Sequence, residues 1–167
     1  MSDMTEHEEL RVSNDAMDDA VELQRRIAEE GYLFFRRLQD LDKLRALRRE
    51  MMRAVQEAGW LIAGTDPSAG IADIDKQCTE GDRAYSDGYG RAYRLESFHR
   101  SAHWPEVMDM IEKIVGKPIM PHPQKVARIW FPQYTDHTTP THQDFVHFQG
   151  SFDTLTCWAP VGDCPVG

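Results

Sequence analysis

Apolar residues recur every three or four positions in three stretches within the first 117 residues. This spacing places them on one face of a helix and predicts amphipathic helices over residues 16–30, 41–58 and 105–115. A glycine follows each stretch, which is a common way for a helix to end. We therefore expect the N-terminal two thirds of the chain to be organised around helices.

Residues 64–103 interrupt this pattern. They carry scattered glycines and three tyrosines at intervals of four, and we expect a long surface loop with one short helix near Tyr85–Leu95. A lid over a substrate is the alternative, because long loops in compact domains often cover binding sites. Three arginines in this stretch would then suit an acidic substrate: Arg83, Arg91 and Arg94.

The pattern changes after Pro118, where β-branched and aromatic residues become frequent. This composition is typical of β-strands, and a short aromatic stretch near the start of the chain has the same character. A run of helices followed by a run of strands favours an α+β fold. The predicted strands cover residues 32–36, 124–131, 141–148 and 152–158.

Composition is ordinary for a globular protein, with 41% hydrophobic and 28% charged residues among 167. The formal net charge of −9 is concentrated near the start, because the first 30 residues hold ten acidic residues and three arginines. We expect residues 1–13 to be a mobile acidic segment. The other 137 residues carry a net charge of −2, which provides no strongly basic face. We therefore expect neither nucleic acid nor a membrane surface as a partner.

Three cysteines, Cys78, Cys157 and Cys164, are too few and too scattered for a disulfide scaffold. The acidic, polar N-terminus lacks the basic and apolar stretches of a secretory signal. No apolar run approaches the roughly 20 residues that span a bilayer. These features together predict a cytoplasmic protein.

The segment Thr141-His142-Gln143-Asp144 carries the strongest candidate chemistry. Side chains two residues apart on a strand point to the same side, so His142 and Asp144 would present an imidazole and a carboxylate together. These groups supply two of the three ligands in the two-histidine, one-carboxylate triad of non-haem Fe(II) enzymes. A His-x-Asp triplet also arises by chance, and a capped turn or a surface ion pair is the alternative interpretation.

The sequence around the triplet makes it more specific. A Gly-Tyr-Leu-Phe-Phe-Arg stretch lies near the start of the chain, Val-Ala-Arg-Ile-Trp precedes the triplet, and Leu-Thr-Cys-Trp-Ala-Pro follows it. In this order, and together with His142-Gln143-Asp144-Phe145, these stretches resemble the phytanoyl-CoA dioxygenase family of Fe(II)/2-oxoglutarate-dependent oxygenases. The resemblance covers most of the chain.

The resemblance implies a double-stranded β-helix, which is a jelly-roll, cupin-like fold with helices packed outside. The expected fold class is therefore α+β and β-rich. Residues 14–167 would be the N-terminal part of one such domain, with a helical layer over 14–117 and jelly-roll strands over 118–167. A jelly roll has about eight strands, and this chain offers three or four, so we expect an incomplete barrel.

The resemblance also implies an activity, a 2-oxoglutarate-dependent dioxygenase that uses Fe(II) and O₂ to hydroxylate a small-molecule substrate. His142 and Asp144 would be the metal ligands and the catalytic residues. Oxidative decarboxylation of 2-oxoglutarate to succinate and CO₂ would drive hydroxylation of a C–H bond. The cofactor supplies this chemistry, and the protein orients the reactants.

Three further residues match family positions near 2-oxoglutarate or iron, and they are Gln124, Arg128 and Trp158. Gln124 and Arg128 share one face of a predicted strand, and Arg128 would pair with a carboxylate. The alternatives are a surface arginine paired with a nearby acidic residue and a tryptophan buried in the core. His147 is not expected to be a ligand, because strand alternation points it away from the face that carries His142.

Two functional residues of the family have no counterpart in this sequence. The second metal histidine and the arginine that holds the far carboxylate of 2-oxoglutarate lie past the equivalent of Gly167. We therefore expect this chain to supply the His-x-Asp half of the metal site. The alternatives are a catalytically incomplete fragment, a non-catalytic binding module on the same scaffold, and a metal-dependent isomerase or epimerase that needs no 2-oxoglutarate.

Overall fold

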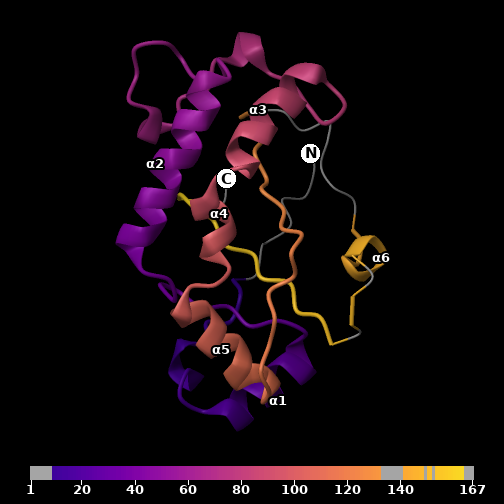
Figure 1. Cartoon of the computed structure of the whole chain (residues 1–167). Helices are drawn as coiled ribbons and strands as arrows, with labels where there is room; N and C mark the ends of the chain where they lie inside the picture. Colours follow the sequence, from indigo (N-terminus) through magenta and orange to yellow (C-terminus); the bar gives the residue numbers. More distant parts are fainter. Residues whose placement is uncertain (1–8, 133–140, 149, 152, 164–167) are drawn as a thin grey trace, which may run out of the picture. The chain divides into compact units, whose positions relative to one another are not determined.

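The computed structural model describes residues 9–132, 141–148, 150–151 and 153–163. These residues form six α-helices and three short 3-10 helices (Figure 1). The α-helices are α1 (Ala20–Glu30), α2 (Leu41–Glu57), α3 (Arg83–Tyr93), α4 (Glu96–Ser101), α5 (Pro105–Val115) and α6 (Phe145–Phe148). The 3-10 helices are η1 (Asn14–Ala16), η2 (Pro67–Ala69) and η3 (Ile74–Lys76).

The chain divides into two compact units, which we describe separately. The first unit contains the described residues up to Asp40 together with residues 102–121. The second contains residues 41–101 and the described residues from His122 onward. Within the described ranges, no helix has both the length and the apolar character needed to cross a membrane.

The first unit is built on α1 and α5. The Asp19 carboxylate caps α1 by accepting the backbone N–H of Glu22 at 3.0 Å, and Gly31 ends the helix at a φ of 78°. The predicted helix over 16–30 therefore ends as expected but begins later, because residues 14–16 form the separate helix η1. Apolar side chains from η1, α1 and α5 meet around Leu23, which is completely buried.

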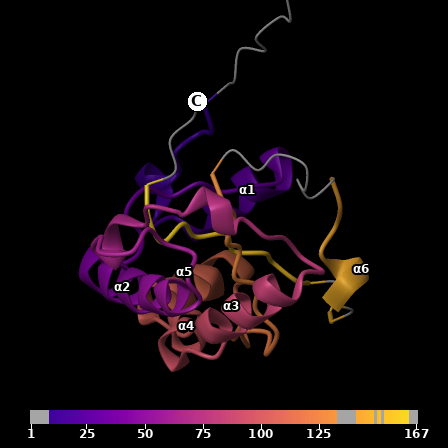
Figure 2. The same ribbon diagram turned by 90° about the horizontal axis from the view of Figure 1, so that it is seen from above.

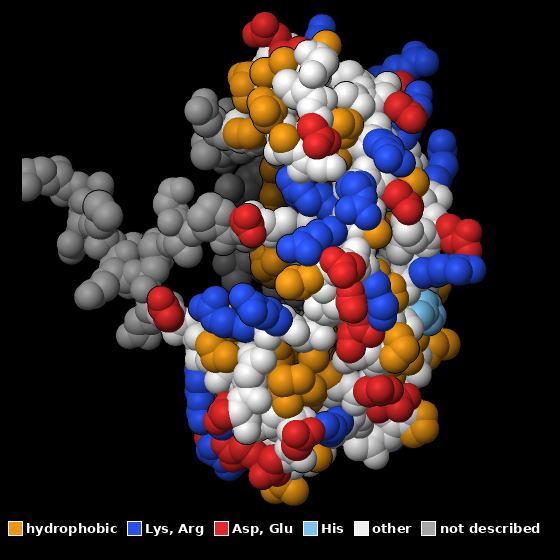
Figure 3. All heavy atoms as spheres, turned by 90° about the vertical axis from the view of Figure 1, so that its left-hand side faces the viewer, with side chains coloured by type: hydrophobic (Ala, Val, Ile, Leu, Met, Phe, Trp, Pro, Cys, Tyr) orange, Lys and Arg blue, Asp and Glu red, His pale blue; other side chains and the backbone are white. Residues whose placement is uncertain are grey.

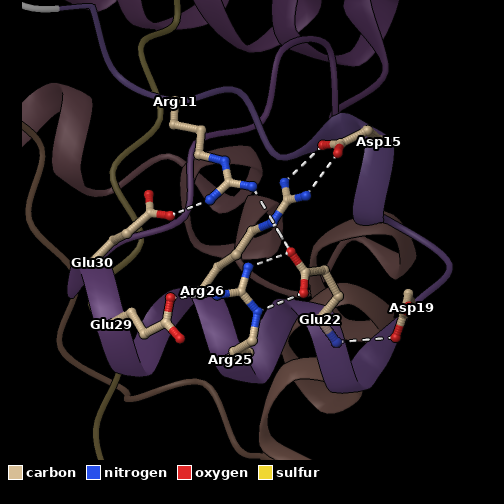
Figure 4. A network of polar contacts seen from close by, with 8 residues as sticks. All are labelled: Arg11, Asp15, Asp19, Glu22, Arg25, Arg26, Glu29 and Glu30. Carbon is tan, nitrogen blue, oxygen red and sulfur yellow. Dashed lines mark hydrogen bonds and ion pairs between the residues drawn. The ribbon is translucent and has the colours of Figure 1, made fainter.

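An arginine-centred network of hydrogen bonds joins η1 to α1 (Figure 4). Arg26 is only 4% exposed and donates two hydrogen bonds of 2.7 Å to the Asp15 carboxylate and a third of 2.7 Å to Glu22. Hydrogen bonds from Arg25 and Arg26 lower the pKa of Glu22 to about 2. The Arg26 hydrogen bonds also lower the pKa of Asp15. Paired in this way, the guanidinium of Arg26 is tolerated away from water.

The second unit is organised around α2 and α3, which pack on each other. Figure 2 shows these two helices side by side, as does Figure 1. Trp60 fills the core of the unit and approaches α3 at Gly88, where an added Cβ would lie 2.2 Å from Trp60 Cζ2. A glycine at this position is therefore required by the close approach of the indole ring.

The stretch predicted to be a loop with one short helix contains more structure than expected. Helix α3 covers the predicted helix near Tyr85–Leu95, and α4, η2 and η3 lie in the remainder. The three tyrosines at intervals of four stack along α3, with ring centroids 5.7 Å apart for Tyr85 and Tyr89 and 5.6 Å apart for Tyr89 and Tyr93. Their spacing therefore marks a helix face, because residues four apart are neighbours on a helix.

The prediction of a β-rich jelly roll is wrong. The described part of the chain contains no strand, and its β pairings are two isolated bridges, Val12 with Phe34 and Leu61 with Ala72. A strand exists only when its backbone N–H and C=O groups meet a partner, and side-chain composition does not supply one. Residues 1–8, Phe152 and Cys164, on which parts of the predictions fall, lie outside the described residues.

The segment predicted as the strand 124–131 shows why composition misled the prediction. Burial alternates along it, with Ala127 and Phe131 4% and 6% exposed and Val126 and Trp130 45% and 58% exposed. Phe131 packs into the core around Trp60, so one face of an extended segment is covered by helices. Buried and exposed residues therefore do alternate with a period of two, but the alternation reflects packing on helices and not pairing in a sheet. Likewise, residues 145–148 of the predicted strand 141–148 form α6.

Candidate functional site

The strongest candidate site surrounds His142 and Asp144, in the turn that leads into α6. The backbone carbonyl of Asp144 accepts hydrogen bonds from the N–H groups of His147 at 2.9 Å and Phe148 at 3.1 Å, so it anchors the first turn of the helix. The Asp144 side chain meets the imidazole, with Asp144 Oδ1 lying 3.2 Å from His142 Nε2. Both side chains are about one third exposed, at 35% for His142 and 32% for Asp144.

The second oxygen of Asp144 is held from a different part of the chain. The Thr156 hydroxyl donates a hydrogen bond of 2.6 Å to Asp144 Oδ2. This bond lowers the pKa of Asp144, and the hydrogen bond and charge of His142 contribute in the same direction. The carboxylate is therefore ionised and fixed in orientation, with one oxygen toward Thr156 and the other toward His142.

An open cavity of about 660 Å³ lies next to this pair. It lies within the range of small-molecule sites in proteins, about 300–1,000 Å³. Phe145 provides an apolar surface, and the other side chains are polar. The lining residues are His142, Gln143, Asp144, Phe145, Thr154 and Thr156.

The donor atoms of this pair fit two adjacent ligand positions of one metal ion. An octahedral ion with ligands about 2.1 Å away places neighbouring ligand atoms about 3 Å apart. The separation of 3.2 Å between His142 Nε2 and Asp144 Oδ1 is close to that value. An imidazole and a carboxylate are also two of the ligand types that Fe(II) takes in oxygenases. The same separation is that of an ion pair between the imidazole and the carboxylate, which is the alternative interpretation of the triplet. The two groups also have the chemistry to hold part of a metal site.

The described residues do not contain a complete metal centre. Among them, no group of three or more His, Cys, Asp or Glu side chains is arranged to hold an ion. The prediction of a metal-binding protein is therefore not supported by the described residues alone. His147 lies nearer to the pair than strand alternation predicted, with its ring centroid 5.8 Å from that of His142, because residues 145–148 turn as a helix.

The three residues expected near 2-oxoglutarate do not line this cavity. Arg128 forms an ion pair with Glu80, with 3.1 Å between Nη1 and Oε1, which is the surface pairing considered as an alternative. The backbone N–H of Gln124 donates to His122 Nδ1 at 3.2 Å. Trp158 is 68% exposed. The structure therefore brings together His142 and Asp144 but not the predicted cofactor-binding residues.

Thr156 is the site residue that sequence reasoning did not identify. The predicted strand 152–158 contained one signal, because side chains two residues apart on an extended segment share a face, and Thr154 and Thr156 both line the cavity. The contact between Thr156 and Asp144 spans 12 residues and depends on how the intervening chain turns back. Sequence spacing alone does not provide that information.

No family model, no curated protein and no solved structure matches this chain.

Proposed function

We propose that this chain supplies the His142 and Asp144 half of a mononuclear iron site in a 2-oxoglutarate-dependent dioxygenase that acts on a small molecule. The observation that carries the proposal is the 3.2 Å separation of His142 Nε2 and Asp144 Oδ1 beside an open cavity. The family resemblance of the sequence around the pair supports the same activity. The missing ligand would come from outside the described residues.

Each residue of the site has a role in this proposal. His142 and Asp144 would hold the metal ion through the imidazole and the carboxylate. Thr156 keeps Asp144 Oδ2 occupied by a hydrogen bond, so that the carboxylate offers a single oxygen to the ion. Phe145 provides an apolar wall for the substrate. When bound, Fe(II) supplies the position at which 2-oxoglutarate and O₂ react and the substrate is hydroxylated.

A metal titration tests the proposal on the chain as it is. We expect saturable binding of one Mn(II) ion per chain. Binding is measured by the loss of the electron paramagnetic resonance signal of free Mn(II). His142→Ala should abolish this binding, and His103→Ala, which removes an exposed histidine from the first unit, should leave it unchanged. Absence of saturable binding in the unaltered chain would contradict the proposal.

A second titration tests the 2-oxoglutarate chemistry. Anaerobic addition of Fe(II) and 2-oxoglutarate to a full-length version that carries the remaining metal ligand should give a weak charge-transfer absorption band that His142→Ala removes. Admission of O₂ should then yield succinate. A chain that binds metal but gives neither the band nor succinate would favour the second candidate below.

The second candidate is a non-catalytic binding module. It is favoured by the positions of Gln124, Arg128 and Trp158, none of which lines the cavity beside His142. In this case the cavity would bind a small molecule without turnover. Succinate formation, even uncoupled from hydroxylation, would exclude this candidate.

A further inference from the structure

A separate cavity of about 360 Å³ lies in the second unit, where α2 meets the C-terminal end of α3. Its volume lies in the range of small-molecule sites, which begins at about 300 Å³. Three of its side chains are arginines, and Figure 3, which views the side on which α2 lies, shows Lys and Arg side chains gathered in groups with acidic side chains between them. The lining residues are Glu50, Arg53, Ala54, Glu57, Arg91, Arg94 and Leu95.

The acidic side chains of this cavity have partners among the described residues, whereas two of its arginine side chains do not. Glu50 accepts a hydrogen bond of 2.5 Å from the Ser97 hydroxyl, and Glu57 Oε2 lies 3.3 Å from Arg91 Nη1. Both carboxylates are therefore engaged by neighbouring side chains. The side chains of Arg53 and Arg94, in contrast, form no hydrogen bond or ion pair within the described part of the chain. Two guanidinium groups therefore border the cavity without an anionic partner.

The Arg94 side chain lies against a part of the α3 backbone that carries no side chain. Gly90 lies one turn before Arg94, and an added Cβ at Gly90 would be 3.8 Å from Arg94 Nη2. The Arg94 side chain thus lies back along α3 over a residue that has no side chain of its own. Ala54 and Leu95 add apolar surface between the charged groups.

We propose that this cavity binds a small amphiphilic oxyanion, a carboxylate or phosphate with a short apolar body. Guanidinium groups recognise such oxygens through paired N–H donors, and Arg53 and Arg94 have those donors available. The apolar body would rest on Ala54 and Leu95. This site is independent of the His142 and Asp144 pair and of the function proposed for it.

A nuclear magnetic resonance titration of the full chain tests this proposal with hexanoate and hexyl phosphate as probes. We expect saturable shifts of the Arg53 and Arg94 Nε–H signals with at least one probe. The stronger of the two probes identifies the headgroup that the site prefers. Acetate and inorganic phosphate, which lack the apolar body, should bind at least tenfold more weakly than their hexyl counterparts.

Matched variants separate a site from general electrostatic attraction. Arg53→Gln and Arg94→Gln should each weaken binding about tenfold, as expected for the loss of a hydrogen bond to a charged group. Arg49→Gln removes the same charge one turn earlier on α2, outside the cavity lining, and should change binding less than twofold. His142→Ala should have no effect.

Three results would overturn this proposal. The first is the absence of saturable binding of either probe. The second is a loss of affinity with Arg49→Gln equal to that with Arg53→Gln and Arg94→Gln. The third is equal affinity for acetate and hexanoate together with equal affinity for inorganic phosphate and hexyl phosphate. Because all the exchanged arginines are exposed, far-ultraviolet circular dichroism should show the folded spectrum for each variant.

Discussion

Two carboxylate-centred sites in this protein resemble each other in their chemistry and differ in their surroundings. Asp15 in the first unit and Asp144 in the second each accept side-chain hydrogen bonds, and each has a lowered pKa. The partner of Asp15 is the buried guanidinium of Arg26, which also reaches Glu22. The partners of Asp144 are a hydroxyl and an imidazole, and they border an open cavity.

This difference separates a structural site from a candidate functional one. A lowered carboxylate pKa marks both sites, so the shift alone does not indicate function. The Arg26 network uses the donors of one side chain to join two elements of the same unit, and it borders none of the cavities described above. The His142 and Asp144 pair instead places an imidazole nitrogen and a carboxylate oxygen next to space for a ligand. The type of partner and the adjoining space distinguish the two sites.

The largest predicted effect tests whether the first unit depends on its apolar core more than on its arginine network. Leu23 is completely buried, so Leu23→Ala should lower the free energy of unfolding by about 3 kcal/mol. Urea denaturation followed by circular dichroism measures this loss. Asp15→Asn, which weakens the network at an exposed carboxylate, should lower stability less. A greater loss for Asp15→Asn would show that the network dominates.

The next prediction contrasts the two carboxylates directly. Asp144→Asn keeps the shape of the side chain but removes its charge, and it should weaken Mn(II) binding at least 100-fold, or about 2.7 kcal/mol. Asp15→Asn should leave Mn(II) affinity unchanged. Calorimetric titration of both variants measures the difference. If the two variants lose metal affinity equally, the assignment of Asp144 as a ligand is incorrect.

Thr156 should have a smaller effect on the same measurement. Thr156→Val removes the hydroxyl that holds Asp144 Oδ2 and should weaken Mn(II) binding about tenfold, as is typical for groups that orient a metal ligand. Thr156→Ser retains the hydroxyl and should restore most of the affinity. Equal affinities for the valine and serine variants would show that the hydrogen bond does not position the carboxylate.

The smallest predicted effect concerns acid stability. The pKa of Glu22 is about 2 in the folded protein, below its usual 4.5, so its ionised form stabilises the fold. This stabilisation is complete above pH 4.5 and is lost as the pH falls toward 2. Glu22→Gln should therefore reduce the fall of the urea midpoint between pH 5 and pH 3. Urea denaturation at intervals of about one pH unit measures this change. An unchanged slope would assign the acid sensitivity to other carboxylates.

Local signals predicted α1, α2 and α5 because these helices have their own start and stop residues, whereas α4 and α6 were not predicted. Gly31 and Gly116 adopt left-handed backbone conformations at the ends of α1 and α5, and Pro105 begins α5. Helix α2 was predicted to within one residue. Such signals act within a few residues, so a single sequence contains them.

The strands could not be predicted in the same way. The alternation along Ala127–Phe131 is present in the burial pattern, but strand pairing depends on residues that are distant in the sequence. For the His142 and Asp144 pair, the contact was predicted correctly and the local structure was not. The two side chains meet as the triplet suggested, although a turn into α6 brings them together and not a strand.

The stacked aromatic residues of the second unit have an optical consequence. Trp60 lies 5.7 Å from Tyr85 by ring centroids, and Tyr85 continues into the stack with Tyr89 and Tyr93. Light absorbed by these tyrosines will pass to the nearby indole, which is shielded from water at 3% exposure. Trp130 and Trp158 emit instead from a hydrated environment. Blue-shifted, tyrosine-sensitised fluorescence from Trp60 therefore reports the packing of α2 against α3 without any added label.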